Sequence, residues 1–239
     1  MSAYPLHNIL FLDIETVSQY DGYEKVPEEG KELWNRKAEF LIKDKLAETA
    51  ETVYNRAGIY AEFGKIICIS CGVISESGTE KKLLLKSFWG DEEKIILQQF
   101  CDMLAKWTPG PPKYLCAHNG KEFDFPYLCR KLIIHGLPVP SILQLSGKRP
   151  WEIPHLDTME LWKFGEYKNY ASLNLLAYAL GIPTPKDDID GSMVGEVYWK
   201  QGDLPRIVAY CQKDVITVAR IYLRLCGEPT IGPENIQIK

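Results

Sequence analysis

Two carboxylates lie two residues apart at the end of an apolar run near the start of the chain. Asp13 and Glu15 follow the apolar residues 9–12, and side chains two apart on a strand point to the same face. Buried carboxylates repel each other and need a counter-charge, yet no Lys or Arg lies within six residues on either side. A bound divalent cation would supply it, since hard cations prefer oxygen ligands. The alternative is a strand that ends at Leu12 and continues into a polar loop.

A third carboxylate, Asp124, immediately precedes a helix expected from about Phe125 to His135. Asp is a common N-cap, and Pro126 suits the first turn of a helix. A capping Asp at the mouth of a helix can also face a metal. The residue types therefore leave both a capping role and a metal-binding role open for Asp124.

Tyr210 and Asp214 lie in a long helix expected from about Leu204 to Cys226. Asp is disfavoured in the middle of a helix, where it gains nothing from capping, so Asp214 either faces solvent or serves a site. Tyr210 precedes it by one turn and shares nearly the same face. A core aromatic residue is the alternative for Tyr210.

The elements around these residues predict an α/β fold. Strands are expected over 7–16, 65–74, 81–88, 113–118 and 155–157, with helices after the third, fourth and fifth strands. The second and third strands form an antiparallel hairpin, and the first strand is expected between that hairpin and the fourth. Residues from about 31 to 60 are predicted to form one or two helices, a lid or decoration inserted after the first strand.

Taken together, the motifs resemble those of the DEDDy 3′-5′ exonucleases. The matching residues are Asp13-Ile14-Glu15-Thr16, His118-Asn119-Gly120 through Phe123-Asp124-Phe125-Pro126, and Tyr210-Cys211-Gln212-Lys213-Asp214. The likeness is to the proofreading exonuclease domain of family B DNA polymerases, and more narrowly to its stand-alone bacterial relatives. It implies one ribonuclease H-like domain over 1–239, with a mixed five-stranded sheet flanked by helices and a helical insertion over about 17–60.

The same resemblance implies roles for individual residues. Asp13, Glu15, Asp124 and Asp214 would bind two divalent metal ions, Mg²⁺ or Mn²⁺. Tyr210 would position the attacking water, which completes a catalytic set of five. Substrate contacts are expected from Thr16, Asn119 and Phe123, with Phe123 as a core residue in the alternative. Stacking on an aromatic ring suits a single strand that is read without sequence preference.

The expected activity is metal-dependent 3′-5′ hydrolysis of single-stranded or frayed DNA ends to nucleoside 5′-monophosphates. One alternative is trimming of RNA 3′ ends, because nothing in the sequence settles recognition of the 2′-hydroxyl. Another is a nucleic-acid-binding module without catalysis, since a fold alone does not imply function. The insertion over 31–60 could also bind a partner protein or a second copy, and an exposed Trp34 would favour that hypothesis.

Composition limits the other possibilities. The net charge is −4, so the chain is no polycation that binds nucleic acid by bulk charge. No apolar stretch is long enough to span a membrane, and the first residues lack the pattern of a secretory signal. Seven scattered Cys residues fit reduced thiols and a cytoplasmic location. Cys68 and Cys71 form a C-x-x-C inside a strand, where they would face opposite sides and could not share a zinc ion.

Overall fold

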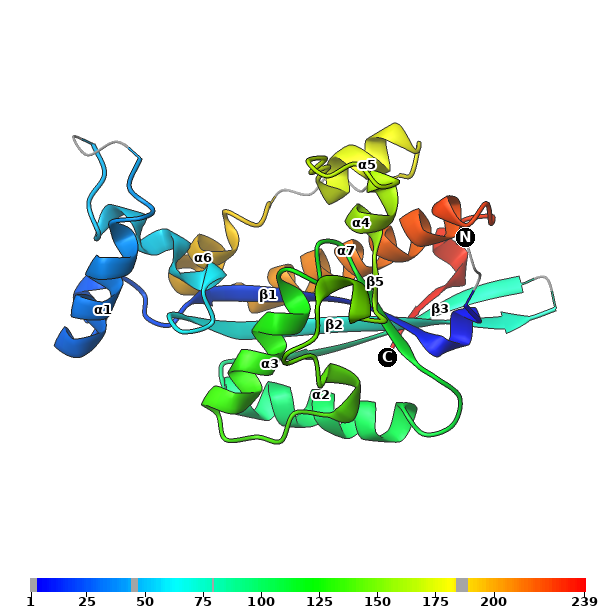
Figure 1. Cartoon of the computed structure of the whole chain (residues 1–239), viewed down its shortest axis with the longest axis horizontal. Helices are drawn as coiled ribbons and strands as arrows, with labels where there is room; N and C mark the ends of the chain where they lie inside the picture. The colour runs from blue at the N-terminus through cyan, green and yellow to red at the C-terminus, as the bar shows by residue number, and fades with distance from the viewer. Residues whose placement is uncertain (1–3, 44–46, 79, 184–188) are drawn as a thin grey trace.

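A mixed sheet of six strands forms the centre of the computed structural model, which describes residues 4–43, 47–78, 80–183 and 189–239 (Figure 1). Its strand order is β5-β4-β1-β2-β3-β6. β1 runs parallel to β4 and antiparallel to β2, so the first strand is central, as predicted. The strands are β1 (Ile9–Ser18), β2 (Gly64–Ser77), β3 (Glu80–Trp89), β4 (Tyr114–Ala117), β5 (Leu156–Asp157) and β6 (Ile236–Ile238).

Helices cover both faces of this sheet. The α-helices are α1 (Glu28–Ala38), α2 (Glu93–Trp107), α3 (Asp124–Ile134), α4 (Thr158–Lys163), α5 (Leu173–Ala179), α6 (Val194–Glu196) and α7 (Leu204–Leu225). The 3-10 helices are η1 (Leu6–Asn8), η2 (Tyr23–Lys25), η3 (Thr52–Ile59), η4 (Ser141–Leu143), η5 (Pro150–Glu152) and η7 (Pro233–Asn235), and η6 (Val197–Gln201) is a π-helix. In Figure 1, α2 and α3 lie below the sheet, whereas α7 lies above it together with α4 and α5.

The central strand is buried on both faces, which explains its continuous apolar run. Leu10 and Leu12 pack into the core that includes α2 and α3. Ile9 and Phe11 pack into the core that includes α7. Because side chains alternate along a strand, Asp13 and Glu15 continue the row that faces α7.

A β-bulge interrupts the pairing of β1 with β2 beside the carboxylates. Glu15 is opposite Cys68, but the next residue, Thr16, is opposite Ile66, so Ile67 has no partner on β1. A bulge of this kind bends the strand and redirects side chains. Ile67 and Cys68 consequently both join clusters that contain residues of α7.

The segment between β1 and β2 has its own small core. Of the one or two helices predicted over 31–60, α1 and the 3-10 helix η3 form, while residues 44–46 lie outside the described residues. Trp34 is fully buried among Val53, Tyr54 and Ala57, and its indole N–H donates to the Ala50 carbonyl over 2.7 Å. The burial of Trp34 removes the observation that would have favoured partner binding through this side chain.

The sheet has one more strand than the five predicted. β6 pairs with the outer edge of β3 in parallel, with Leu83 opposite Ile236. Three residues are too few to show a periodicity, so the sequence gives no local sign of this strand. Among the described residues, no helix is both long and apolar enough to span a membrane. All seven cysteines are unpaired thiols.

Candidate active site

β1 presents Asp13 and Glu15 side by side to α7. Glu15 is buried and Asp13 is half-buried. Their neighbours on β2 are Ser70 and Cys68, both buried, so neither residue paired with the carboxylates offers a positive charge. The strand therefore continues through both carboxylates, and the alternative of a polar loop after Leu12 is wrong.

α7 brings Tyr210 and Asp214 to the same place. Its N-cap is Asp203, whose side chain accepts from the Arg206 N–H over 3.3 Å. Tyr210 and Asp214 are both half-buried and hydrogen-bond to each other. Asp214 also interacts electrostatically with Asp13 and Glu15, which places the mid-helix carboxylate beside the strand pair.

Asp124 joins the cluster from the N-terminus of α3 and does not cap that helix. It is the first residue of α3, and its side chain is buried. The carboxylate accepts from the backbone N–H of Ile14, beyond the point where β4 stops pairing with β1. Its Oδ1 atom is buried without a hydrogen-bond partner. A buried, unpartnered carboxylate oxygen is costly, and a bound cation would satisfy it.

Electrostatics show how crowded these acids are. Burial, followed by repulsion from Glu15, Asp214 and Asp124, raises the pKa of Asp13 well above its usual value. Burial, and then Asp214, does the same to the pKa of Glu15. Burial raises the pKa of Asp124 to about 7. A divalent cation reverses each of these effects, because it favours the ionised carboxylates.

The donor set of this cluster fits a metal ion. Oxygen atoms of Asp13 and Glu15 and the Sγ atom of Cys211 all lie within 4.8 Å of one another. Carboxylate oxygens suit Mg²⁺ and Mn²⁺, whereas a thiol suits softer metals. Cys211 is buried, and its Sγ lies 3.3 Å from Asp13 Oδ2, a distance at which the thiol donates to the carboxylate.

Asn119 lies in a turn that three other residues hold in place. Its backbone is left-handed, with φ 61°, and its side-chain Oδ1 is buried without a partner. Asp157, the N-cap of α4, accepts from the backbone N–H of Asn119 over 2.9 Å and of Lys121 over 3.1 Å. His118 hydrogen-bonds Thr158 Oγ1 and the Ala171 carbonyl, each over 2.9 Å. The turn is thereby tied to the segment that contains α4.

Thr16 and Phe123 line a cavity of about 730 Å³ that begins at Glu15. Thr16 hydrogen-bonds the Tyr127 hydroxyl, which in turn donates to the Gly58 carbonyl over 2.9 Å. Phe123 is half-buried, and its ring centroid lies 5.3 Å from that of Tyr127. One part of the Phe123 ring thus packs on the core and another part faces the cavity.

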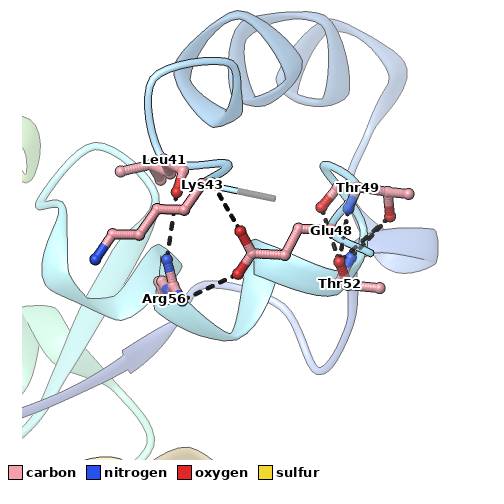
Figure 2. Close-up of polar contacts among 6 residues, drawn as sticks. All are labelled: Leu41, Lys43, Glu48, Thr49, Thr52 and Arg56. Carbon is pink, nitrogen blue, oxygen red and sulfur yellow. Dashed lines mark hydrogen bonds and ion pairs between the residues drawn. The ribbon is translucent and has the colours of Figure 1, made fainter. Parts of the chain in front are cut away.

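The far wall of the cavity comes from the segment between β1 and β2. Tyr54, Asn55 and Arg56 line it. Figure 2 shows how Glu48 braces this wall: its carboxylate accepts from the Lys43 N–H over 2.8 Å and pairs with Arg56 over 3.3 Å. Arg56 also donates to the Leu41 carbonyl over 3.4 Å. The described residues of this segment therefore form one side of the cavity and are held there by hydrogen bonds.

Sequence reasoning missed three residues that support the site. Cys211 stood in a matched motif without a role, and Asp157 and Tyr127 stood outside the motifs. Each acts through a tertiary contact that no local pattern reveals. The prediction for the C-x-x-C pair is confirmed, because Cys68 packs toward α7 with Cys211 while Cys71 packs into the opposite core.

Comparison with known proteins agrees with this geometry. The family described as "Predicted 3'-5' exonuclease related to the exonuclease domain of PolB" matches residues 59–228, well over half of the chain. The chain belongs to this family. The matched residues include Asp124, Tyr210 and Asp214, whereas β1 with Asp13 and Glu15 precedes them.

A solved structure supports the fold of this PolB-related exonuclease family member. The family B DNA polymerase from the hyperthermophilic archaeon Pyrobaculum calidifontis is similar with a TM-score of 0.56 and 16% identity. The alignment covers 92% of this chain and 24% of the polymerase chain. A search of curated proteins found no match. The ribonuclease H-like α/β fold expected from the sequence is thus confirmed.

Proposed function

We propose that the chain is a metal-dependent 3′-5′ exonuclease that releases nucleoside 5′-monophosphates from single-stranded or frayed DNA ends. The observation that supports this most strongly is the convergence of four carboxylates and one phenol from β1, α3 and α7. Asp13, Glu15, Asp124 and Asp214 would bind two divalent ions, Mg²⁺ or Mn²⁺. The proposal treats residues 1–239 as a single domain whose 19–63 segment forms one side of the substrate cavity.

Bound divalent ions supply a lowered pKa for the attacking water and charge neutralisation for the leaving oxygen. Tyr210 has the complementary role of orienting that water. Burial, followed by Asp214 and Glu15, raises the pKa of Tyr210 far above its usual value, so the phenol keeps its proton at neutral pH. A protonated Tyr210 donates a hydrogen bond and does not act as a general base. The Tyr210 hydroxyl donates this hydrogen bond either to Asp214 or to the attacking water.

The terminal nucleotide would enter the cavity beside Glu15. Thr16 and Phe123 line this cavity, and Asn119, outside the lining, has a buried amide oxygen without a hydrogen-bond partner. We expect Thr16 to bind the sugar, Phe123 to stack on the base and Asn119 to contact the backbone, all without reading a sequence. An unpaired strand end meets such a site more easily than a duplex end, because its base is free to stack.

The decisive experiment is cleavage of a 5′-labelled single-stranded DNA oligonucleotide with Mg²⁺ or Mn²⁺, against an EDTA control. We expect a ladder that shortens from the 3′ end only when metal is present. Asp214→Asn should lower the cleavage rate at least about 100-fold, because metal affinity and charge balance are lost together. Asp102→Asn, an exposed carboxylate on α2 across the sheet, is the matched control and should cleave normally.

Four results would contradict parts of the proposal. Metal-independent cleavage, or full activity of Asp214→Asn, would remove the two-metal mechanism. Cleavage of a matched RNA oligonucleotide but not of DNA would retain the chemistry and reassign the substrate to RNA 3′ ends. Binding without cleavage of either would leave only a nucleic-acid-binding module.

A further inference from the structure

Several strongly exposed aromatic side chains lie within one short stretch of the chain that the catalytic proposal does not use. Phe164 is 76% exposed, Tyr167 87%, Tyr170 67% and Tyr178 85%. These four are more than half of the exposed Phe, Tyr and Trp residues in the described ranges, yet they fall within fifteen consecutive positions. We call residues 163–178 the aromatic platform.

Burial in a core does not explain these rings. α5 packs on α7 through other residues, among them Leu176 and Ala177 against Ile221. Phe164 also has a left-handed backbone, with φ 45°, which is unfavourable for a bulky side chain. A non-glycine residue held in this conformation, with its ring in solvent, gains little from packing, which favours a role in binding a ligand.

The platform carries positive charge among its rings. Lys163 Nζ lies 4.5 Å from the centroid of Tyr170, and Lys168 is exposed between Tyr167 and Tyr170. Its one acidic residue, Glu166, accepts from the Asn169 side chain over 2.9 Å. Aromatic faces interleaved with lysines match single-stranded nucleic acid, whose bases stack on the rings while its phosphates are neutralised by the lysines. This local positive charge contrasts with the net charge of −4 of the whole chain.

The platform is joined to the candidate active site. His118, beside Asn119, hydrogen-bonds both ends of the segment that precedes α5: Thr158 at the start of α4 and Ala171 just before α5. α7 provides a second link, since it carries Asp214 and, two turns later, the Ile221 that packs against α5. In Figure 1, α4 and α5 rise beside α7, away from α1 and α6 at the other end. The cavity at Glu15 lies on the side of α6, because Gly195 and Glu196 line it.

We propose that the aromatic platform stacks the bases of the single-stranded nucleic acid several nucleotides upstream of the 3′ end bound at the carboxylates. This inference rests on the proposed function and adds a second, non-catalytic binding surface to it. Phe164 and Tyr167 contribute stacking faces, while Lys163 and Lys168 neutralise phosphates. Affinity should then depend on oligonucleotide length, because a short strand fills the cavity but does not reach the platform.

The test measures binding by fluorescence anisotropy with 5′-fluorescein dT12 and dT3, in EDTA, using Asp214→Asn as the uncleaving background. We expect dT12 to bind more tightly than dT3. Tyr167→Ala and Phe164→Ala should each weaken dT12 binding about tenfold and leave dT3 binding unchanged. Phe40→Ala, which removes an 86% exposed ring from the segment after β1, is the matched control and should change neither.

A second series of variants separates base stacking from non-specific hydrophobic contact. Tyr167→Trp should retain dT12 binding and Tyr167→Leu should lose it, because leucine is apolar but has no π face. A 5-iodouracil placed upstream of the 3′ end should photocrosslink within 163–178.

Each outcome has one meaning. If dT12 and dT3 bind equally, or if the platform variants bind dT12 as the background does, the platform inference is overturned and the rings serve another macromolecule. If neither oligonucleotide binds at all, the platform inference is overturned, whereas the proposed function is tested separately by metal-dependent cleavage with the wild type. Length-dependent binding that is lost with Tyr167→Leu supports both.

Discussion

At the scale of single residues, the site is a set of acids that disfavour one another in the absence of a cation. Glu15 and Asp124 are buried, and repulsion adds to burial in raising the pKa of Asp13. The clustering of these acids could be predicted from the sequence, because their spacing placed the side chains of each pair on one face of a strand or helix. Cys211 could not, because its contact with Asp13 joins residues 198 positions apart.

Asp124→Asn should stabilise the metal-free protein while lowering its activity. The folded pKa of Asp124, about 7, is above the unfolded value, so the folded state binds more protons between roughly pH 4 and 7. Stability contributed by the protonated form is therefore present at low pH and is lost as pH rises through about 7. At pH 8 the amide of the Asp124→Asn variant avoids this loss, which is on the order of a few kcal/mol in the free energy of unfolding.

Thermal unfolding in EDTA at pH 5 and pH 8 checks this expectation. The wild type should gain stability on acidification relative to Asp124→Asn, and the variant should melt higher at pH 8. Asp102→Asn should follow the wild type at both values. A variant that melts lower than the wild type at pH 8 would show that the Asp124 carboxylate is satisfied without metal.

Cys211 should act as a positioning residue for Asp13. Its thiol donates to Asp13 Oδ2 and fixes the direction of that carboxylate, so Cys211→Ala should weaken metal binding by about tenfold. Cys211→Ser should restore most of the affinity, because the hydroxyl also donates. Mn²⁺ titration followed by electron paramagnetic resonance measures this directly, and equal affinities for the alanine and serine variants would contradict the role.

At the scale of elements, a helix or strand could be predicted where its own residues carry the sequence pattern that specifies it. β1, the β2–β3 hairpin, α2 and α7 were predictable because each carries its own apolar period and its own stop signals. Of the one or two helices predicted over 31–60, α1 and η3 form, but their bounds were not predictable, since much of that segment's order comes from the packing of Trp34 with residues about twenty positions later. β6 exists only through its pairing with β3.

Trp34→Ala should loosen the segment between β1 and β2 and with it the far wall of the cavity. Loss of a fully buried indole costs about 3–5 kcal/mol where the site cannot collapse, and the bond to Ala50 is lost as well. Limited proteolysis should then cut within residues 19–63, and cleavage of DNA should slow. Leu33→Ala, an exposed neighbour on α1, should do neither. Normal cleavage by a variant cut in this segment would show that the wall is dispensable.

At the scale of the whole molecule, one sheet holds together contributions from distant parts of the chain. The motifs predicted that β1, α3 and α7 meet, and the fold confirms their meeting. The cavity was not predictable, because its two sides come from residues near 55 and near 195 that share no pattern. The aromatic platform was equally hidden, since exposure is a property of the folded surface.

Mg²⁺ or Mn²⁺ should raise the melting temperature of the whole protein. Binding to the folded state alone at a hundred times the dissociation constant adds about 2.7 kcal/mol, which corresponds to roughly 5–11 °C for a domain of this size. Differential scanning fluorimetry with and without metal measures the shift, and Asp13→Asn should abolish most of it. An unchanged melting temperature at saturating metal would contradict a site built from these carboxylates.

The left-handed turn at Asn119 has a consequence for chemical ageing. Asn119 is followed by Gly120, and an Asn-Gly pair is the combination most prone to deamidation through a succinimide ring. A bulkier residue after an asparagine usually slows this reaction. Position 120 does not accept one, because a Cβ there would lie 2.4 Å from the Cβ of Ala117. Deamidation would leave an aspartate or isoaspartate, and so one more negative charge, in the loop that leads to Asp124. Stored protein would then lose the proposed nuclease activity while its secondary structure stayed intact.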